Sequence, residues 1–250
     1  MGRLPALLVI AVLVACATNT AWAGPLVVLD PGHGGSNMGA YGPRIKRYEK
    51  ALTLDLSRRV LRHLDKRRPD ISVVLTRDRD TYLTLDQRVR KANGLKANLF
   101  VSIHFNACAT RSQQGFETFI LTREASAQEA ARLSMQTRQR GGGVVGAILS
   151  DLRQSAAHGD SALLARRIQR HLSSARGARL DRGVRQAPFD VLLGLRMTGV
   201  LVEVGFIDHP TESRTLVREA HLEAVAAALA AAVSEHLSRP GKALRRLSRR

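Results

Sequence analysis

Aromatic residues and cysteines are scarce in this chain. Phenylalanine, tryptophan and tyrosine together supply 4% of its 250 residues, which argues against a nucleic-acid binder that stacks bases on aromatic side chains. The two cysteines are Cys16 and Cys108. If Cys16 is removed with a leader segment, no internal disulfide can form, and Cys108 is then either a reactive thiol or an idle one.

Acidic residues are also in short supply. The chain carries 39 Lys and Arg against 21 Asp and Glu, a formal net charge of +18. An excess of positive charge says little about the fold, but it indicates that the protein binds an anionic partner. For an exported protein we expect this partner to be an anionic wall polymer or membrane surface rather than nucleic acid. Residues 239–250 hold five arginines, one lysine and no acid. We predict that this basic tail binds such a surface, with a merely solvated tail as the alternative.

The one long apolar run lies at the N-terminus. Met1-Gly2-Arg3 carries one positive charge, Leu4 to Ala17 is nearly all apolar, and Ala21-Trp22-Ala23 follows. This order is typical of a secretory signal peptide, and the run is too short to favour a spanning helix. We therefore predict a signal peptide over residues 1–23 and an exported, periplasmic protein. The alternative is a lipoprotein leader in which Cys16 is lipidated.

Strand patterns and helix patterns alternate along residues 24–238, which predicts a single α/β domain. The twisted sheet should be mostly parallel, with about six strands and helices on both faces. The predicted strands are 26–30, 71–76, 99–103, 116–121, 189–193 and 200–204. The predicted helices are 49–64, 85–96, 125–140, 144–152, 162–172 and 220–237.

Two predicted strands each deliver a histidine at their carboxyl end. Val27-Val28-Leu29-Asp30-Pro31-Gly32 leads into His33, and Leu99 to Ile103 leads into His104. A single histidine at such a position is more often structural. Because the carboxyl ends of parallel strands form the ligand-binding edge of an open sheet, two of them indicate a joint site.

Two glutamates extend this site. Glu49 is the first residue of an amphipathic helix pattern, and a carboxylate is favoured there by the helix dipole alone. If this helix begins next to the His33 loop, Glu49 also belongs to the site of His33. Glu203 interrupts the apolar run Val200 to Val204, so it must be paired, near a metal, or at the open strand end. His33, Glu49 and His104 form the three-ligand set of a catalytic zinc site, with Glu203 as the candidate general base.

At this point the chain resembles a known family, the zinc-dependent N-acetylmuramoyl-L-alanine amidases of the cell-separation type. The matching stretches occur in the family's order: 28–35, Glu49-Lys50, 75–77, 85–88 with Ala92-Asn93, 100–107 and 202–207. The resemblance implies that His33, Glu49 and His104 bind Zn²⁺ and that Glu203 is catalytic. It also implies cleavage of the amide between N-acetylmuramic acid and L-alanine in peptidoglycan, for wall remodelling or daughter-cell separation.

Residues 124–158 are a predicted regulatory insert. Family members that act in cell division carry a helix here that plugs the active site until a protein activator removes it. In this chain residues 133–140 contain no acid that could bind zinc, which leaves Glu124 and Glu129 as substitutes. We predict a helix over 123–143 with a hinge at Gly141-Gly142-Gly143 that covers the cleft sterically. The alternative is a surface helix.

Several alternatives stay open at this level. A wall-binding protein without catalysis would lack one of the four site residues, and none is missing. A zinc peptidase that cuts within the stem peptide would carry the same residues. Asn106 either orients substrate or makes a local turn hydrogen bond, and Arg77 either pairs with a structural carboxylate or touches substrate.

Overall fold

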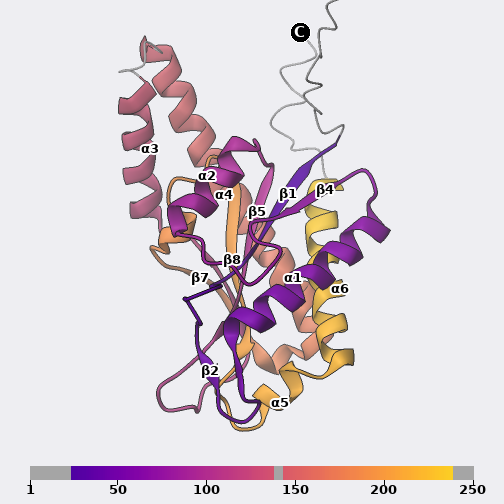
Figure 1. Ribbon diagram of the computed structural model, residues 1–250. Helices are drawn as coiled ribbons and strands as arrows, with labels where there is room; N and C mark the ends of the chain where they lie inside the picture. The colour runs from indigo at the N-terminus through magenta and orange to yellow at the C-terminus, as the bar shows by residue number, and fades with distance from the viewer. Residues whose placement is uncertain (1–23, 138–142, 239–250) are drawn as a thin grey trace, which may run out of the picture.

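A six-stranded sheet with the order β4-β1-β5-β8-β6-β7 forms the centre of the protein (Figure 1). The computed structural model describes residues 24–137 and 143–238. The strands are β1 (Leu26–Pro31), β4 (Ser72–Leu75), β5 (Leu99–Asn106), β6 (Phe116–Ile120), β7 (Asp181–Gln186) and β8 (Thr198–Phe206). Neighbours run parallel except β6 and β8, which confirms the predicted fold class.

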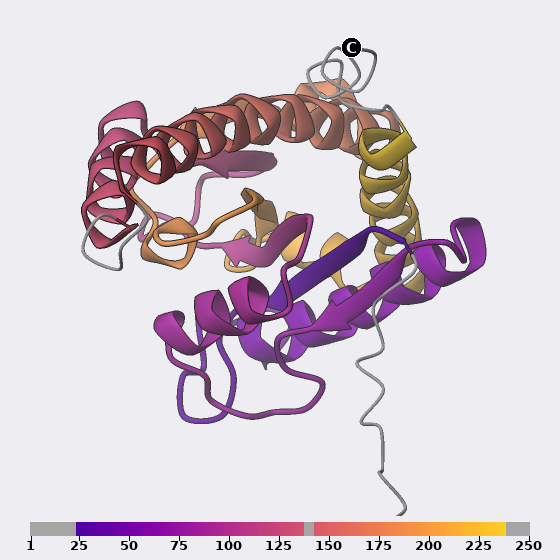
Figure 2. The same cartoon turned by 90° about the horizontal axis from the view of Figure 1, so that it is seen from above.

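Helices cover both faces of this sheet. On one face α1 (Glu49–Arg67), α4 (Gly143–Arg176) and α6 (Glu219–Ser238) pack over the larger hydrophobic core. On the other, α2 (Leu85–Gly94) and the short η3 (Asp190–Leu192) pack over a smaller core. Figure 2 shows the long α4 crossing one side of the molecule to meet α6. The remaining elements are α3 (Arg123–Thr137), η2 (Ala178–Leu180), α5 (Glu212–Leu216) and the hairpin of β2 (Tyr41–Gly42) and β3 (Arg47–Tyr48).

The side chains of β5 alternate between the two faces of the sheet, and this alternation places its polar side chains on one face. Val101 and Ile103 belong to the larger core, whereas Phe100 belongs to the smaller one. Because successive side chains of a strand point to opposite faces, Ser102 and His104 lie on the face of Phe100. There α2 and η3 border a cavity at the carboxyl end of the sheet rather than filling it.

Two sequence-based assignments are wrong. Residues 189–193, predicted as a strand, contain η3 instead; Val191 and Leu192 are apolar because they fill the smaller core, not because they pair with a strand. The edge strand β7 was missed because its sequence, DRGVRQ, is half exposed and has no hydrophobic alternation. The predicted helices 144–152 and 162–172 are one continuous helix, α4.

The predicted signal peptide, the basic tail and Gly141-Gly142 lie outside the described residues. The helix predicted after residue 123 is confirmed as α3, and its predicted place over the cleft stays a prediction. Within the described segments, no residue that lines the cavity at the carboxyl end of the sheet comes from α3 or α4, and α3 packs against α4. A regulatory role of residues 124–158 stays a prediction. No helix in 24–137 or 143–238 is long and apolar enough to cross a membrane.

Candidate metal centre

The loop that carries His33 has an uncommon backbone conformation. His33 has a φ of +62°, and Gly34 and Gly35 have φ of +126° and +57°. A positive φ is unfavourable for a residue with a Cβ and needs support from its surroundings. The guanidinium of Arg88 gives that support by donating hydrogen bonds to the carbonyl oxygens of Pro31 and His33, at 2.8 and 2.7 Å.

Arg88 is itself held by a buried ion pair with Asp30. Arg88 Nη1 lies 2.7 Å from Asp30 Oδ1, and the two side chains are 3% and 1% exposed. Thr76 Oγ1 donates to Asp30 Oδ1 at 2.5 Å and Ser102 Oγ to Oδ2 at 2.8 Å. Buried ion pairs need such additional hydrogen bonds to offset desolvation, so this network is a rigid base for the His33 loop.

Arg77 is a second buried guanidinium below the same loop. It donates to the carbonyl oxygens of Pro31, Gly32 and Lys50 at 3.0, 2.8 and 2.8 Å. Burial lowers the pKa of Arg77 to about 10, with a further contribution from the charge of Arg88. Among the described residues no carboxylate is bonded to Arg77, so the predicted pairing is wrong, and Arg77 does not line the cavity.

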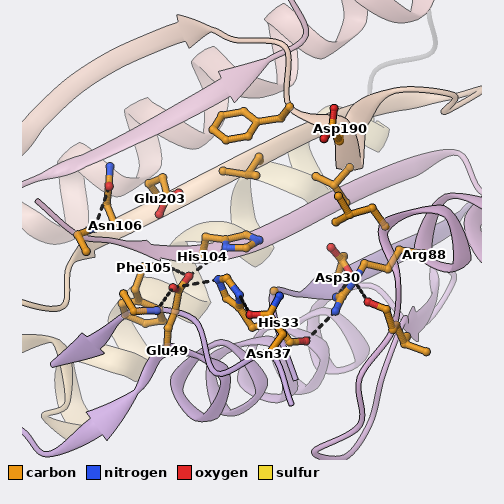
Figure 3. Close-up of a pocket in the computed structure, with 18 of the residues that line it drawn as sticks. Asp30, His33, Asn37, Glu49, Arg88, His104, Phe105, Asn106, Asp190 and Glu203 are labelled. Atoms are coloured by element: carbon orange, nitrogen blue, oxygen red, sulfur yellow. Dashed lines mark hydrogen bonds and ion pairs between the residues drawn. The ribbon is translucent and has the colours of Figure 1, made fainter. Parts of the chain in front are cut away.

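His33, Glu49 and His104, which we call the triad, meet at this loop (Figure 3). Glu49 is the first residue of α1; its Oε2 lies 3.0 Å from His33 Nε2 and its Oε1 lies 2.9 Å from His104 Nδ1. The backbone N–H groups of Ala40 and Phe105 each donate to one of these oxygens, at 3.0 Å. The sequence prediction that these three residues share one site is therefore met by their geometry.

The charges within the triad keep Glu49 ionised. Burial alone raises the pKa of Glu49, but hydrogen bonds from His104 and His33 outweigh it and bring the pKa well below its usual range. Burial lowers the pKa of His33, yet its hydrogen bond and charge interaction with Glu49 leave the pKa raised. The site thus holds an ionised carboxylate whose charge a cation can balance.

The geometry of the triad fits a metal ion. One ligand atom from each residue can be chosen so that all three lie within 4.8 Å of one another. Asn37 Oδ1 accepts from His33 Nδ1 at 2.9 Å, which orients the ring and leaves Nε2 for a metal. A Cβ at Gly32 would meet the His104 ring at 2.2 Å, and one at Gly39 would meet Glu49 Oε2 at 2.8 Å. Only glycine leaves room for both ligands at these two positions.

Glu203 extends toward the same space from the neighbouring strand (Figure 3). It pairs in register with His104, at the carboxyl end of the sheet as predicted. Its Oε2 is buried and has no hydrogen-bond partner within the described part of the chain. Burial raises the pKa of Glu203 well above the ordinary value, and the charges of Glu49 and Glu117 add to this. A buried carboxylate without a partner is a candidate for chemistry rather than structure.

A cavity of about 540 Å³ lies between these groups, within the range of small-molecule sites. The triad and Glu203 form one part of its wall, and the side chains of Tyr82 and Phe189 contribute to another. Cys108 does not line the cavity; its half-buried Sγ lies 3.2 Å from Thr110 Oγ1. The cavity therefore brings the metal-type ligands and the unpartnered carboxylate together without the thiol.

Asn106 and Glu117 link this wall to the edge of the sheet. Asn106 Oδ1 accepts the local hydrogen bond from Ala107 N–H that one alternative predicted, at 2.8 Å, while its Nδ2 donates to Glu117 Oε1 at 2.8 Å. Glu117 Oε2 contacts Nε of both Arg182 and Arg185, at 3.1 and 2.7 Å. Sequence analysis missed Glu117, although it is an acid inside an apolar strand, the same signal that identified Glu203.

Comparison with known proteins gives matches over most of the chain. A family model described as N-acetylmuramoyl-L-alanine amidase matches residues 27–235. The amidase AmiC of Escherichia coli O6:H1 is 32% identical over 223 residues, which cover 85% of this chain and 53% of AmiC. This chain thus spans about half the length of the AmiC proteins that it matches.

Solved structures of similar proteins share the fold. An N-acetylmuramoyl-L-alanine amidase from Clostridium difficile 630 aligns with a TM-score of 0.69 and 28% identity, over 88% of this chain and 100% of that chain. The catalytic domain of CwlV, an amidase from Paenibacillus polymyxa, aligns with a TM-score of 0.66 and 31% identity, over 86% of this chain and 98% of that one. The described domain therefore covers nearly all of both solved chains, one of which is the catalytic domain of CwlV.

Proposed function

Because this chain belongs to the N-acetylmuramoyl-L-alanine amidase family, we propose that it hydrolyses the amide between N-acetylmuramic acid and L-alanine in peptidoglycan. The observation that carries the proposal is the cavity, whose wall holds the triad beside Glu203, a carboxylate whose buried Oε2 has no partner in the described part of the chain. Metal-dependent amide hydrolysis needs both parts: ligands that leave a coordination position open, and a base that is not a ligand.

The triad would hold a zinc ion through two imidazole nitrogens and one carboxylate. When bound, zinc supplies a polarised carbonyl and a water whose pKa is lowered to roughly 7. The protein's own contribution is to orient these ligands. Asn37 fixes the His33 ring, and the N–H groups of Ala40 and Phe105 fix the Glu49 carboxylate.

Glu203 would move the proton. Its carboxylate accepts a proton from the attacking water and then donates this proton to the leaving nitrogen of L-alanine. The C–N bond breaks, the lactyl group leaves as a carboxylate, and the stem peptide leaves as an amine. The raised pKa of Glu203 suits this double role, since a carboxyl with an elevated pKa is a better acid in the second step.

The setting of this activity is part of the proposal. Residues 1–23 would export the enzyme to the periplasm, with lipidation at Cys16 as the alternative, and the enzyme would act in wall remodelling or cell separation. Residues 239–250 would hold it near an anionic wall or membrane surface. Residues 124–158 would be the part that a protein activator contacts.

Mass spectrometry of the products of purified peptidoglycan tests the proposed reaction. We expect release of free stem peptides that begin with L-alanine, with loss of this release in the presence of a chelator and in Glu203→Gln. Products cut between two amino acids would identify a zinc peptidase instead. Peptidoglycan that is bound but remains intact would identify a wall-binding protein.

A further inference from the structure

Arg185 lies on the edge strand β7, on the face of the sheet that borders the cavity. It pairs in register with Phe119 of β6, whose ring contacts that of Phe189 with centroids 4.9 Å apart, and Phe189 lines the cavity. Glu117 of β6 pairs in register with Glu203. Because alternate residues of a strand share a face, Arg185, Phe119, Glu117 and Glu203 all belong to the cavity face.

This edge of the cavity carries more positive charge than its structure needs. Arg182 already neutralises Glu117, and it is held further by Gln113 Oε1 at 2.8 Å and by the Phe206 ring, whose centroid lies 5.0 Å away. Arg185 is the second guanidinium on the same carboxylate. Its side chain is 50% exposed, and its one contact in the described segments is from Nε to Glu117, at 2.7 Å. Neither terminal nitrogen of Arg185 has an acceptor among the described residues.

The guanidinium that lines the opposite end of the cavity differs in this respect. The side chain of Arg88 is 3% exposed. Its terminal nitrogens donate hydrogen bonds to Asp30 and to the carbonyl oxygens of Pro31 and His33. It has no capacity for a ligand. No residue of β7 lines the cavity itself, so an anionic group meets Arg185 only where the substrate extends out of the cavity, past Phe189 and Phe119, to the edge of the sheet.

We propose that Arg185 binds a carboxylate of the stem peptide, two to three residues beyond the scissile amide; this rests on the proposed function. β7 is two strand spacings away from β8, about 10 Å, which an extended peptide covers in about three residues. A guanidinium with free terminal nitrogens binds a carboxylate through paired hydrogen bonds. Arg185 is then a specificity residue for an acidic peptide on the leaving-group side.

Soluble peptidoglycan fragments with tripeptide stems provide the test. One portion of the fragments keeps its free carboxylates. In the other portion the carboxylates are converted to primary amides with carbodiimide and ammonia. We expect the wild-type enzyme to cleave the free acid with a kcat/KM roughly 3- to 10-fold higher than the amide, the range of a half-exposed charge-assisted contact. Arg185→Ala should lose this preference, mainly through a higher KM on the free acid, and Arg185→Lys should keep part of it.

Arg170→Ala is the matched control. Arg170 is also an exposed arginine paired with a carboxylate, Glu235, but it lies on α4, which packs over the opposite face of the sheet; its loss should leave the preference unchanged. Equal losses on both substrates in folded Arg185→Ala would show that Arg185 only supports Glu117, and the proposal would be wrong. Equal cleavage of acid and amide by the wild type would also overturn it. Failure to release stem peptides from the free acid would instead refute the proposed function.

Discussion

On the β1 side of the cleft, Asp30 receives hydrogen bonds from Thr76, Arg88 and Ser102, whereas on β8 the Oε2 of Glu203 has no partner in the described segments. Both carboxylates lie at the carboxyl end of the same sheet; Asp30 is fully buried, and Glu203 is half-buried with its Oε2 shielded from water. The Asp30 side gains rigidity from complete pairing, and this rigidity holds the His33 loop. The Glu203 side leaves one oxygen unsatisfied, which lowers stability but keeps a proton acceptor ready. The difference separates a supporting network from a reactive group.

The largest effect should come from removing a member of the triad. Glu49→Ala should lose bound zinc and all measurable turnover, because two histidines without the carboxylate are too few protein ligands to hold the ion. Metal content by mass spectrometry of the dialysed protein, together with peptidoglycan cleavage, measures both. A variant that keeps a full equivalent of zinc would disprove the ligand role of Glu49. His33→Ala and His104→Ala should behave in the same way.

Glu203→Gln should affect chemistry alone. We expect zinc content to remain and turnover to fall by about 10²- to 10⁴-fold, the usual contribution of a general base. The same metal and cleavage assays apply, with Glu49→Ala as the opposite case. If Glu203→Gln loses its zinc, then Glu203 is a ligand and the contrast between the triad and the base does not hold.

Asp30→Asn should test the supporting side. Replacing the acid leaves Arg88 buried without a counter-charge, so we expect the free energy of unfolding to fall by about 3 kcal/mol. Urea unfolding monitored by circular dichroism gives the value. Asp86→Asn, which breaks an exposed ion pair with Arg90, is the control and should cost less than about 1 kcal/mol. Similar losses in both variants would mean that the buried network has no special role.

The pH dependence of stability should distinguish Glu203 from its amide variant. In the metal-free folded state the pKa of Glu203 is raised above the ordinary value of 4.5, so the folded protein keeps a proton that the unfolded chain releases. The stability of metal-free wild type should therefore decrease as the pH rises from 4.5 through the folded pKa. In Glu203→Gln this part of the decrease should vanish. Parallel urea curves in chelator at several pH values measure it, and identical slopes would contradict the assignment.

The smallest effect should follow from loosening α2, the helix that carries Arg88. Thr84 caps α2 by accepting from the backbone N–H of Gln87, whose side chain accepts from the N–H of Thr84. Thr84→Ala should cost about 1 kcal/mol of stability and leave zinc content unchanged. Thermal unfolding and metal analysis together test this, with Thr84→Ser as the variant that preserves the cap. Loss of metal would show that the helix start controls the triad directly.

The resemblance that found the family also pointed to the triad and Glu203, because their signals are local. His33, His104 and Glu203 are titratable residues placed after, or inside, an apolar strand, where burial is unfavourable unless the residue has a task, and Glu49 opens an amphipathic helix. Glu117 carries the same signal but was passed over, and Arg88 carries none, since an arginine on a polar helix is ordinary in sequence. Its role depends on a contact with Asp30, 58 residues away.

The sequence by itself determined five of the six strands of the sheet, the amphipathic face of α1 and the identity of the candidate ligands, because periodicity and burial act over neighbouring residues. The tertiary structure alone decided which strand closes the sheet, how β6 turns antiparallel to β8, and where α3 lies. These features depend on long-range pairing, which polar edge strands such as β7 do not encode in their hydrophobic pattern. For the same reason only the folded chain brings Arg185 to the edge of the cavity.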